Sequence, residues 1–312
     1  MSGSPAIDLS VVIPVFNERE SLPELFRRLR HALDSIGRTW EVVFVDDGSS
    51  DGSVEILKAQ AAAVPAFRVV ELARNFGQHA AVLAGFSAVR GSIVVTLDAD
   101  LQNPPEEIPK LLAEIDAGAD VVGGYRAARQ DSPFRLFVSR LANVWIARST
   151  GIRIRDYGCM LRAYRRWVVD RMVGTREVSS FVPALAHCFT HRISEVAVAH
   201  APRRAGVSKY PFRKLLLLWF DLMTGFSMSP LRGLSLAGGL CFLASFALGA
   251  LLVALRLRYG AGWAAEGVFT LFAVLFFLIG GQFVALGLLG EYVGRIYQDV
   301  RGRPRYVIRN PE

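Results

Sequence analysis

Two aspartates separated by a single residue are the side chains whose spacing is most informative about chemistry. Asp98 and Asp100 follow the apolar stretch from Ser92 to Leu97, and Gln102 comes shortly after them. Carboxylates placed in this way at the end of a strand can bind one divalent cation through their oxygen atoms. Such a cation could neutralise a diphosphate and act as a Lewis acid towards a leaving nucleotide. The alternative for an isolated pair of this kind is a solvated acidic turn.

A second acidic pair lies at the end of another predicted strand. Asp46 and Asp47 follow Trp40 to Val45 in the sequence VDDGSSDGS. Carboxylates at this place are suited to binding the base and ribose of a nucleotide, but Asp, Gly and Ser also form turns and cap helices, and we expect Ser50 or Asp51 to cap the next helix. The sequence has neither a Walker A motif nor G-x-G-x-x-G, so ATPase and dinucleotide-binding functions lose their main support.

Arginines form a third group of candidate site residues. They are Arg126, Arg129, Arg135, Arg140, Arg153, Arg155 and Arg203. Arginine is well suited to bidentate contacts with phosphate, whereas the alternative is a solvated basic surface attracted to anionic lipid. Asp156 lies between Arg155 and Arg162, where it is either a partner in a structural ion pair or a base.

The elements that must position these residues alternate between strands and helices as far as Pro211. The predicted strands are Leu9–Val15, Trp40–Val45, Val69–Leu72, Ser92–Leu97 and Ala119–Gly123. The predicted helices are Ser21–Leu33, with Ser21 and Glu24 as a capping box, one after VDDGSSDGS, Ala80–Val89, Ile108–Ala117 and Ser179–His191. The alternation predicts an α/β fold with a mostly parallel sheet and helices on both faces. Ligands of such sheets bind outside the carboxyl ends of the strands, where both acidic pairs lie.

The C-terminal part of the sequence is apolar. Leu234–Leu255 and Val268–Leu289 each contain about 22 residues without a charge, which is enough for a helix to cross a bilayer. A buried hairpin of core helices is the alternative. Phe212–Phe226 could lie flat in the bilayer interface. More positive charges flank the pair of spans than lie between them, which predicts that both ends are cytoplasmic and the connecting loop is periplasmic.

The overall composition narrows the class of partner. The net charge of +8 suits a nucleic acid, an anionic lipid or a phosphate substrate, and the sequence contains no nucleic-acid-binding module, so we expect no nucleic-acid partner. Cys159, Cys188 and Cys241 lack CxxC spacing, which is typical of reduced thiols in the cytosol. The N-terminal residues do not resemble a signal peptide, so targeting should depend on the C-terminal spans.

Several motifs together resemble the family 2 glycosyltransferases. They are PVFNE (14–18), VDDGSSD (45–51), RNFGQHAAVLAGF (74–86), LDADLQNPPEEIP (97–109) and SKY (208–210). The chain is more narrowly similar to polyprenyl-phosphate sugar transferases, the relatives of dolichol-phosphate mannose synthase, through DYGCMLRAYRR (156–166) and GLLGEYVGRIYQDVRGRPRY (287–306). The similarity extends over nearly the whole chain to the branch that transfers 4-deoxy-4-formamido-L-arabinose to undecaprenyl phosphate.

The resemblance implies a GT-A fold and an inverting transfer from a UDP-sugar to undecaprenyl phosphate, with Mg2+ or Mn2+ as cofactor. The product would be a lipid carrier for the modification of lipid A. The enzyme would be a multi-pass protein of the bacterial inner membrane with a cytoplasmic catalytic domain, in contact with the lipid bilayer and often tetrameric. The expected divisions are a GT-A domain (1–211), interfacial helices (212–232), two transmembrane helices with a short periplasmic loop (233–294) and a basic cytoplasmic tail (295–312).

The resemblance also implies roles for individual residues. The metal would be held by Asp98, Asp100 and Gln102; the nucleotide-sugar would contact Pro14, Phe16, Glu18, Asp46, Asp47, Asp98 and Gln102; the acceptor phosphate would contact Arg126, Arg135, Ser139 and Arg203; and Asp156 and Asp100 would be catalytic. Because a phosphomonoester is mostly a dianion at neutral pH, it needs no base, and we expect Asp156 mainly to orient other groups.

Departures from the family pattern leave the sugar open. Phe16 stands where many relatives have tyrosine, and Val178, Pro202 and Ala205 replace residues expected in the arabinose branch, so glucose or an N-acetylhexosamine is the alternative sugar. A processive polysaccharide synthase is disfavoured because Q-x-x-R-W is absent, with Ala163 at the glutamine position. A scaffold that only binds lipid phosphate is disfavoured by the intact D-x-D motif.

Overall fold

The computed structural model describes residues 7–126, 155–156, 159–175, 182–200, 229–259 and 268–309. The chain divides into two compact units, the first formed by Met1–Tyr210 with Gly302–Glu312 and the second by Pro211–Arg301.

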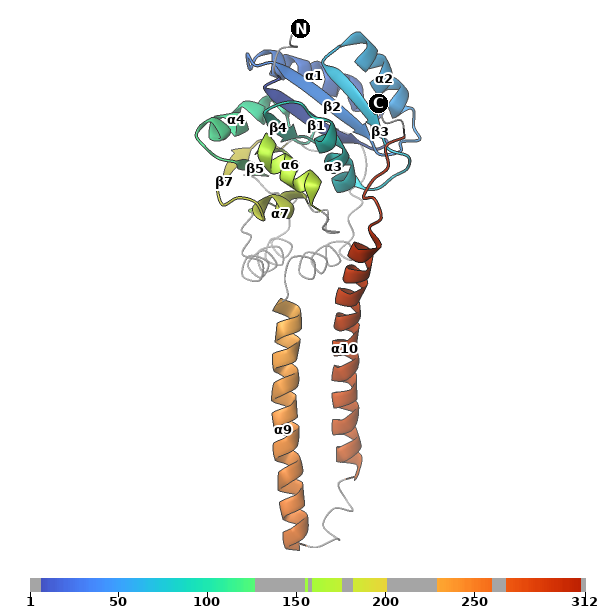
Figure 1. Cartoon of the computed structure of the whole chain (residues 1–312), viewed down its shortest axis with the longest axis vertical. Coiled ribbons are helices and arrows are strands. Elements are labelled where there is room, and N and C mark those ends of the chain that lie inside the picture. The colour runs from blue at the N-terminus through green and yellow to red at the C-terminus, as the bar shows by residue number, and fades with distance from the viewer. Residues whose placement is uncertain are drawn as a thin grey trace. The chain divides into compact units, whose positions relative to one another are not determined.

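The first unit is built on a seven-stranded sheet with the strand order β3-β2-β1-β4-β6-β5-β7 (Figure 1). The strands are β1 (Leu9–Val15), β2 (Trp40–Asp46), β3 (Phe67–Glu71), β4 (Ile93–Thr96), β5 (Val121–Arg126), β6 (Arg162–Arg165) and β7 (Ile193–Val198). β6 runs antiparallel to β4 and β5, and the other neighbouring strands are parallel. The predicted α/β fold is confirmed as a mixed, GT-A-like sheet with helices. The sequence analysis missed β6 and β7.

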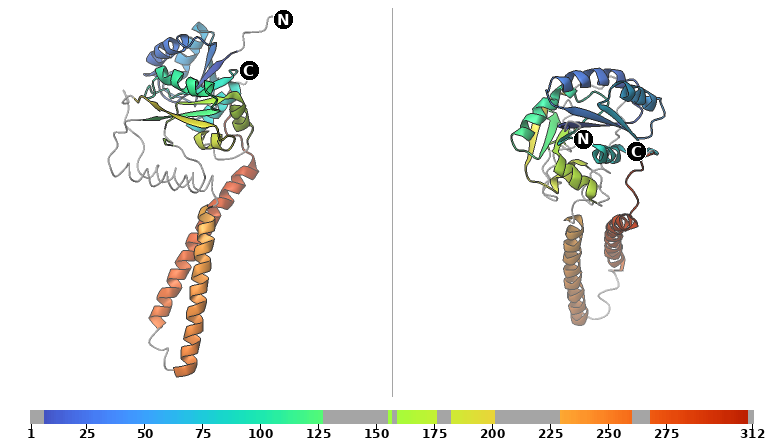
Figure 2. Two further views of the ribbon diagram at one scale, coloured as in Figure 1. Left: turned by 90° about the vertical axis from the view of Figure 1, so that its left-hand side faces the viewer. Right: turned by 45° about the horizontal axis from the view of Figure 1, so that its top comes forward.

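Helices cover both faces of this sheet. They are α1 (Leu22–Asp34), α2 (Ser53–Ala63), α3 (Gln78–Ala88), α4 (Ile108–Asp116), α6 (Arg166–Gly174) and α7 (Val182–His187), with a 3-10 turn η1 (Pro105–Glu107). Side chains alternate across a strand, so Val11 and Ile13 of β1 pack with α1 and α4 while Val12 packs with α3, α6 and α7. α1 and α3 therefore lie on opposite faces of the sheet (Figure 2).

Three local predictions were wrong. Ser21 does not form a capping box, because its backbone is already helical (φ −84°, ψ −26°) and its hydroxyl donates instead to the carboxylate of Glu18 at 2.8 Å. The helix predicted to end at His191 ends at His187, and β7 follows. The N-cap of α2 is Gly52 and not Ser50 or Asp51 as predicted, although the carboxylate of Asp51 accepts the N–H of Ser53, the first residue of the helix (3.0 Å).

The last described residues return to the first unit and pair with its edge strand. Ile308 forms an antiparallel bridge with Leu72, directly after β3. The Ala73 N–H donates to the carbonyl of Val307 and the Arg309 N–H to the carbonyl of Glu71, both at 2.8 Å. This C-terminal segment therefore covers polar groups that an edge strand would otherwise expose (Figure 1).

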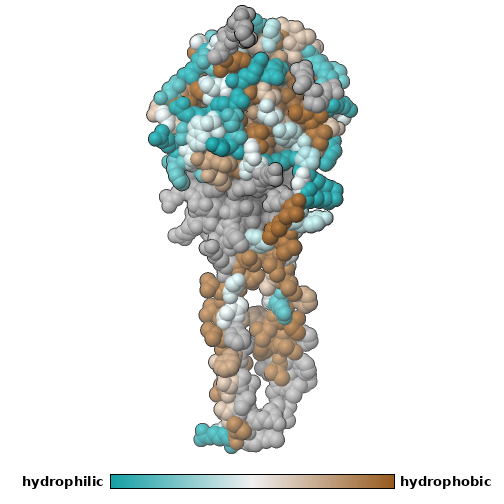
Figure 3. All heavy atoms as spheres, in the orientation of Figure 1, coloured by the Kyte–Doolittle hydropathy of each residue, from teal (hydrophilic) through white to brown (hydrophobic). Residues whose placement is uncertain are grey.

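The second unit contains two long helices, α9 (Ser229–Tyr259) and α10 (Val268–Arg301). Hydrophobic side chains cover much of the visible surface of both (Figure 3), and Phe246 and Phe277 are 70% and 77% exposed. Among the described residues, only Phe277–Gly294 of α10 is long and apolar enough to cross a membrane, whereas α9 has a shorter apolar stretch over Gly233–Leu248. Of the two predicted spans, one thus meets this test and the other is not confirmed.

Candidate active site

Two loops at the carboxyl ends of β1 and β2 are joined by hydrogen bonds into one surface. Asn17 donates its N–H to Ser49 Oγ (3.0 Å), and its side-chain oxygen accepts the N–H of Ser50 (2.9 Å). Asn17 has φ 54°, a left-handed conformation that asparagine tolerates better than most residues. Two more bonds follow: Glu18 N–H to Ser53 Oγ (3.1 Å) and Arg19 N–H to Asp51 Oδ2 (3.0 Å). The loops that carry PVFNE and VDDGSSD therefore form a single structure.

The residues predicted to bind the nucleotide differ in how accessible they are. Phe16 is 47% exposed, so its ring is available for contact with a flat ligand, and Pro14 is partly buried at the end of β1. Asp46 is buried and accepts the N–H of Ser49 (3.1 Å). Glu18 follows Phe16 on the same loop. These side chains lie together where the sequence predicted, at the carboxyl ends of neighbouring strands.

Asp47 has a structural task that the sequence did not reveal. It is 2% exposed, and its two oxygens accept the N–H groups of Phe76 (2.7 Å) and Gly77 (2.9 Å). Burial raises the pKa of Asp47, the two N–H groups oppose this rise, and the charge of Asp46 adds to it. Asp47 thus holds the loop that leads into α3, and its predicted contact with the nucleotide stays a prediction.

Asp98 lies at the centre of the site. One of its oxygens accepts a hydrogen bond from Gln78 Nε2 (2.6 Å) and the other from Asn103 Nδ2 (3.3 Å). Burial raises the pKa of Asp98 to about 7, and the charges of Asp100 and Glu18 act in the same direction. Gln78 and Asn103 were not predicted as site residues, because only the fold shows that α3 and the loop after β4 meet at this carboxylate.

The turn between the two aspartates and Gln102 has an unusual backbone. Leu101 has φ 62° although it is a bulky residue, and it is 6% exposed. Residues held in this region cost about 1–3 kcal/mol and are concentrated at functional sites. The turn brings the Gln102 N–H to 3.1 Å from Asp100 Oδ1. This hydrogen bond and the burial of Leu101 hold the strained turn directly after the D-x-D motif.

The acidic residues fit a divalent cation that a substrate helps to bind. Among the described residues, no group of three or more His, Cys, Asp or Glu side chains could hold a metal by itself. Mg2+ sites commonly use one or two carboxylates together with substrate phosphates, so two carboxylates such as Asp98 and Asp100 would suffice in a site of that kind. Burial first, and then the charges of Asp100 and Glu18, raise the pKa of Asp98, and a bound cation would act in the opposite direction.

Asp156 and Arg126 form a bidentate ion pair beside this centre. Arg126 ends β5 and donates Nε to Asp156 Oδ2 (2.6 Å) and Nη2 to Oδ1 (2.8 Å), and Asp156 is 2% exposed. The charge of Arg126 lowers the pKa of Asp98, so Arg126 lies within electrostatic range of the D-x-D motif. Of the other predicted acceptor residues, Arg135, Ser139 and Arg203 lie outside the described part of the chain, as do Val178, Pro202 and Ala205.

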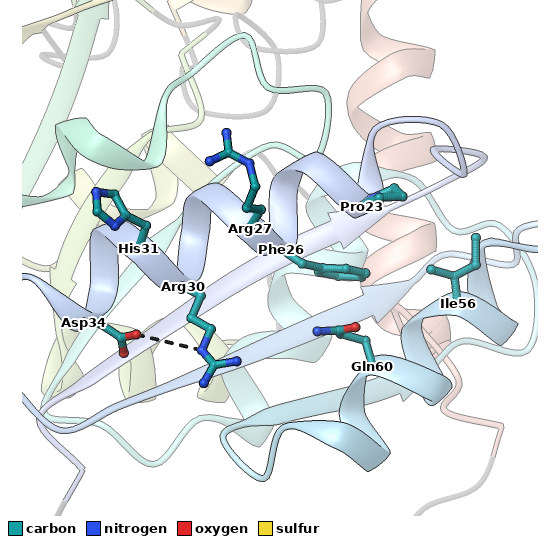
Figure 4. Close-up of a pocket in the computed structure, with 8 residues that line it drawn as sticks. All are labelled: Pro23, Phe26, Arg27, Arg30, His31, Asp34, Ile56 and Gln60. Atoms are coloured by element: carbon teal, nitrogen blue, oxygen red, sulfur yellow. Dashed lines mark ion pairs between the residues drawn. The ribbon is translucent and has the colours of Figure 1, made fainter.

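A hollow of about 600 Å³ lies elsewhere, between α1 and α2 (Figure 4). It is lined by Pro23, Phe26, Arg27, Arg30, His31, Asp34, Ile56 and Gln60. None of these was predicted as a site residue. Arg27 is paired with Glu24 and Arg30 with Asp34, so the cationic side chains already have acidic partners.

The family model for glycosyl transferase family 2 matches residues 10–173. The matched segment contains both acidic pairs, Gln78, Arg126 and Asp156. The chain belongs to glycosyl transferase family 2. This confirms the resemblance to that family inferred from the motifs.

Relatives with closely similar sequences are known for this glycosyltransferase. The undecaprenyl-phosphate 4-deoxy-4-formamido-L-arabinose transferase of Salmonella paratyphi B is 54% identical over 307 residues, which cover 98% of this chain and 94% of that protein. The protein of the same name from Salmonella newport is equally similar. Among solved structures, glucosyl-3-phosphoglycerate synthase from Mycobacterium tuberculosis, in complex with Mn2+, uridine diphosphate and phosphoglyceric acid, has a TM-score of 0.51 and 20% identity, covering 70% of this chain and 77% of that chain. This last similarity concerns the fold alone.

Proposed function

We propose that this glycosyltransferase transfers 4-deoxy-4-formamido-L-arabinose from a UDP-sugar to undecaprenyl phosphate. The observation that carries the proposal is the 54% identity, across 98% of the chain, with proteins of that name. In the reaction, a phosphate oxygen of the acceptor forms a bond to the anomeric carbon, the bond from that carbon to UDP breaks, and UDP leaves with the electron pair. Attack from the opposite face inverts the anomeric centre, and the product would supply lipid A modification.

The donor side of the site is proposed to contain the D-x-D residues. Asp98, Asp100 and Gln102 would hold Mg2+ or Mn2+ with the diphosphate, and the cation would supply Lewis-acid stabilisation of the departing UDP. Phe16 and Asp46, with Pro14, Glu18 and Asp47 near them, would bind the nucleotide. Support comes from the hydrogen bonds that join the loops after β1 and β2 and from the charge of Glu18, which acts on Asp98.

The acceptor side is proposed to contain Arg126 together with Arg135, Ser139 and Arg203. An acceptor phosphate arrives mostly as a dianion, since its second pKa is about 6, so it needs little help from a base. The bidentate contact between Asp156 and Arg126 supports an orienting role for Asp156. The carboxylate would hold the guanidinium in the direction required to contact the phosphate.

The membrane arrangement is proposed to be a hairpin of two spans, in a multi-pass protein of the bacterial inner membrane. The segment after α10 pairs with β3 of the catalytic unit, so the chain must return to the side of the membrane that it left. If α10 crosses once, an earlier segment must cross as well, and α9 is long enough to do so. The full proposal comprises a cytoplasmic catalytic domain (1–211), interfacial helices (212–232), the hairpin (233–294) and a cytoplasmic tail (295–312). A tetramer is proposed from the family resemblance alone.

The decisive experiment measures UDP release by the purified full-length protein. We expect release that requires both undecaprenyl phosphate and Mg2+ or Mn2+, with the UDP-linked formamido-arabinose as the best donor. A site that hydrogen-bonds the formamide would discriminate strongly against sugars that lack it. Equal or better use of UDP-glucose or UDP-N-acetylglucosamine would refute the sugar assignment. Release that does not depend on the lipid phosphate would refute the acceptor.

A further inference from the structure

A buried arginine donates hydrogen bonds to the main chain at Asp156 and at Cys159. Arg162 begins β6, and it is 2% exposed although its side chain is large and charged. Its guanidinium donates Nη2 to the carbonyl of Asp156 (2.9 Å) and Nε to the carbonyl of Cys159 (3.0 Å). Both bonds go to main-chain carbonyls, so this side chain ties the backbone at Asp156 and the backbone at Cys159 to the start of β6.

Asp156 is thereby held from both ends. Its carboxylate is fixed by Arg126 at 2.6 and 2.8 Å, and its carbonyl is fixed by Arg162 at 2.9 Å. Because both the main chain and the carboxylate of Asp156 are held by hydrogen bonds, a shift of its backbone is passed on to the carboxylate. Movement of the Arg162 guanidinium would therefore move the carboxylate that orients Arg126.

Cys159 also connects Arg162 to the donor side of the site. Cys159, whose carbonyl accepts from Arg162, has its Sγ 3.7 Å from Asn103 Oδ1. Asn103 in turn donates Nδ2 to Asp98 (3.3 Å). One continuous set of contacts thus runs from Asp98 through Asn103 and Cys159 to Arg162 and Asp156.

The geometry requires arginine at position 162. Arginine has a planar fork of donors that can satisfy two carbonyls at once, whereas the single ammonium of lysine offers a compact point charge on a flexible stem. The neighbouring strand leaves room for the fork, because a Cβ added to Gly123 would lie only 3.0 Å from Arg162 Nη1. Gly123 and Arg162 therefore form a matched pair.

We propose that Arg162 is a positioning residue that sets Asp156, and through it Arg126, relative to the D-x-D site. The inference rests on the proposed function, because it assigns Asp156 and Arg126 to the acceptor side of that reaction. Misalignment of reacting groups by about 1 Å can cost about a hundredfold in rate. Loss of the Arg162 guanidinium should therefore lower kcat and leave binding of the nucleotide largely unchanged.

The test compares Arg162→Lys and Gly123→Ala with Arg165→Lys. Arg165 is a matched control on the same strand, since its Nε and Nη2 also donate to two carbonyls, of Ala119 (3.0 Å) and Ile115 (2.6 Å) at the end of α4. We expect kcat of Arg162→Lys to fall about 10- to 100-fold and that of Gly123→Ala by a smaller factor, while the control stays within about twofold of the wild type. Binding of UDP in the presence of Mn2+, measured by calorimetry, should change by less than about twofold in all three.

A double-mutant cycle separates positioning from a general loss of structure. In an Asp156→Asn background, Arg162→Lys should lower kcat by less than about twofold further, because the residue through which it acts is already impaired. Multiplicative losses, or a kcat for both test variants within twofold of the wild type, would overturn the proposal. If Arg162→Lys does not fold, the kcat of Gly123→Ala decides alone. Absence of transfer by the wild type would instead refute the proposed function.

Discussion

Replacing Asp156 by asparagine tests whether this residue orients Arg126 or acts as a base. The two carboxylate oxygens of Asp156 accept from the guanidinium of Arg126 at 2.6 and 2.8 Å. In Asp156→Asn one of these oxygens is replaced by an NH2 group, which cannot accept a hydrogen bond. A hydrogen bond to a charged group contributes about 1.5–3 kcal/mol. The side chain of Arg126 is 23% exposed, so water compensates part of the loss and the lower end applies, about 1.5–2 kcal/mol. That corresponds to a decrease in kcat of about 10- to 30-fold.

The assay is a pH–rate profile of transfer to undecaprenyl phosphate by the wild type and Asp156→Asn. The acceptor is already mostly ionised at pH 7, so raising the pH from about 7 to 9 should change the rate ratio of the two proteins by less than about threefold. Arg126→Lys is the companion variant, and its loss should not multiply with that of Asp156→Asn, because both disrupt the same pair. A strong recovery of Asp156→Asn at high pH would refute the orienting role and favour a base.

Three further results are expected. Asp100→Ala should abolish transfer and metal-dependent UDP binding while the protein remains folded and membrane-bound; near-normal turnover would contradict the metal assignment. A reporter fused after Glu312 should be cytoplasmic and one inserted near Gly262 periplasmic, and the reverse pattern would contradict the hairpin. Burial raises the pKa of Glu41, but hydrogen bonds from Ser10 and Arg90 outweigh it and lower the pKa below the usual 4.5. The contribution of the Glu41 carboxylate to stability is therefore present above about pH 4.5, and it is lost as the pH falls through the pKa of the folded state. Glu41→Gln should therefore lower the melting temperature at pH 7 and by a smaller amount near pH 3, and an equal decrease at both would contradict this assignment.

The loops that hold the acidic residues were predictable because their signals are local. Short β-branched runs that end in Asp or Asn mark the strand ends of β1, β2 and β4, and the carboxyl ends of parallel strands meet at one edge of a sheet. β6 gave no such signal: Arg162–Arg165 is short and polar, and its place in the sheet depends on pairing with β4 and β5 on both sides. Central strands of this kind are stabilised by neighbours that are distant in the sequence.

The sequence by itself determined the family, the D-x-D motif and the apolar character of the C-terminal helices, because these depend on residue type and spacing along the chain. Only the tertiary structure decided what Asp47 and Asp156 contact. The first carboxylate is engaged by the backbone before α3 and the second by Arg126. It also decided that the chain's last described residues return to β3 and that Arg162 donates to the carbonyls of Asp156 and Cys159. Each of these contacts joins groups through space at hydrogen-bond distance, and such pairs form only once packing has brought their separate elements together.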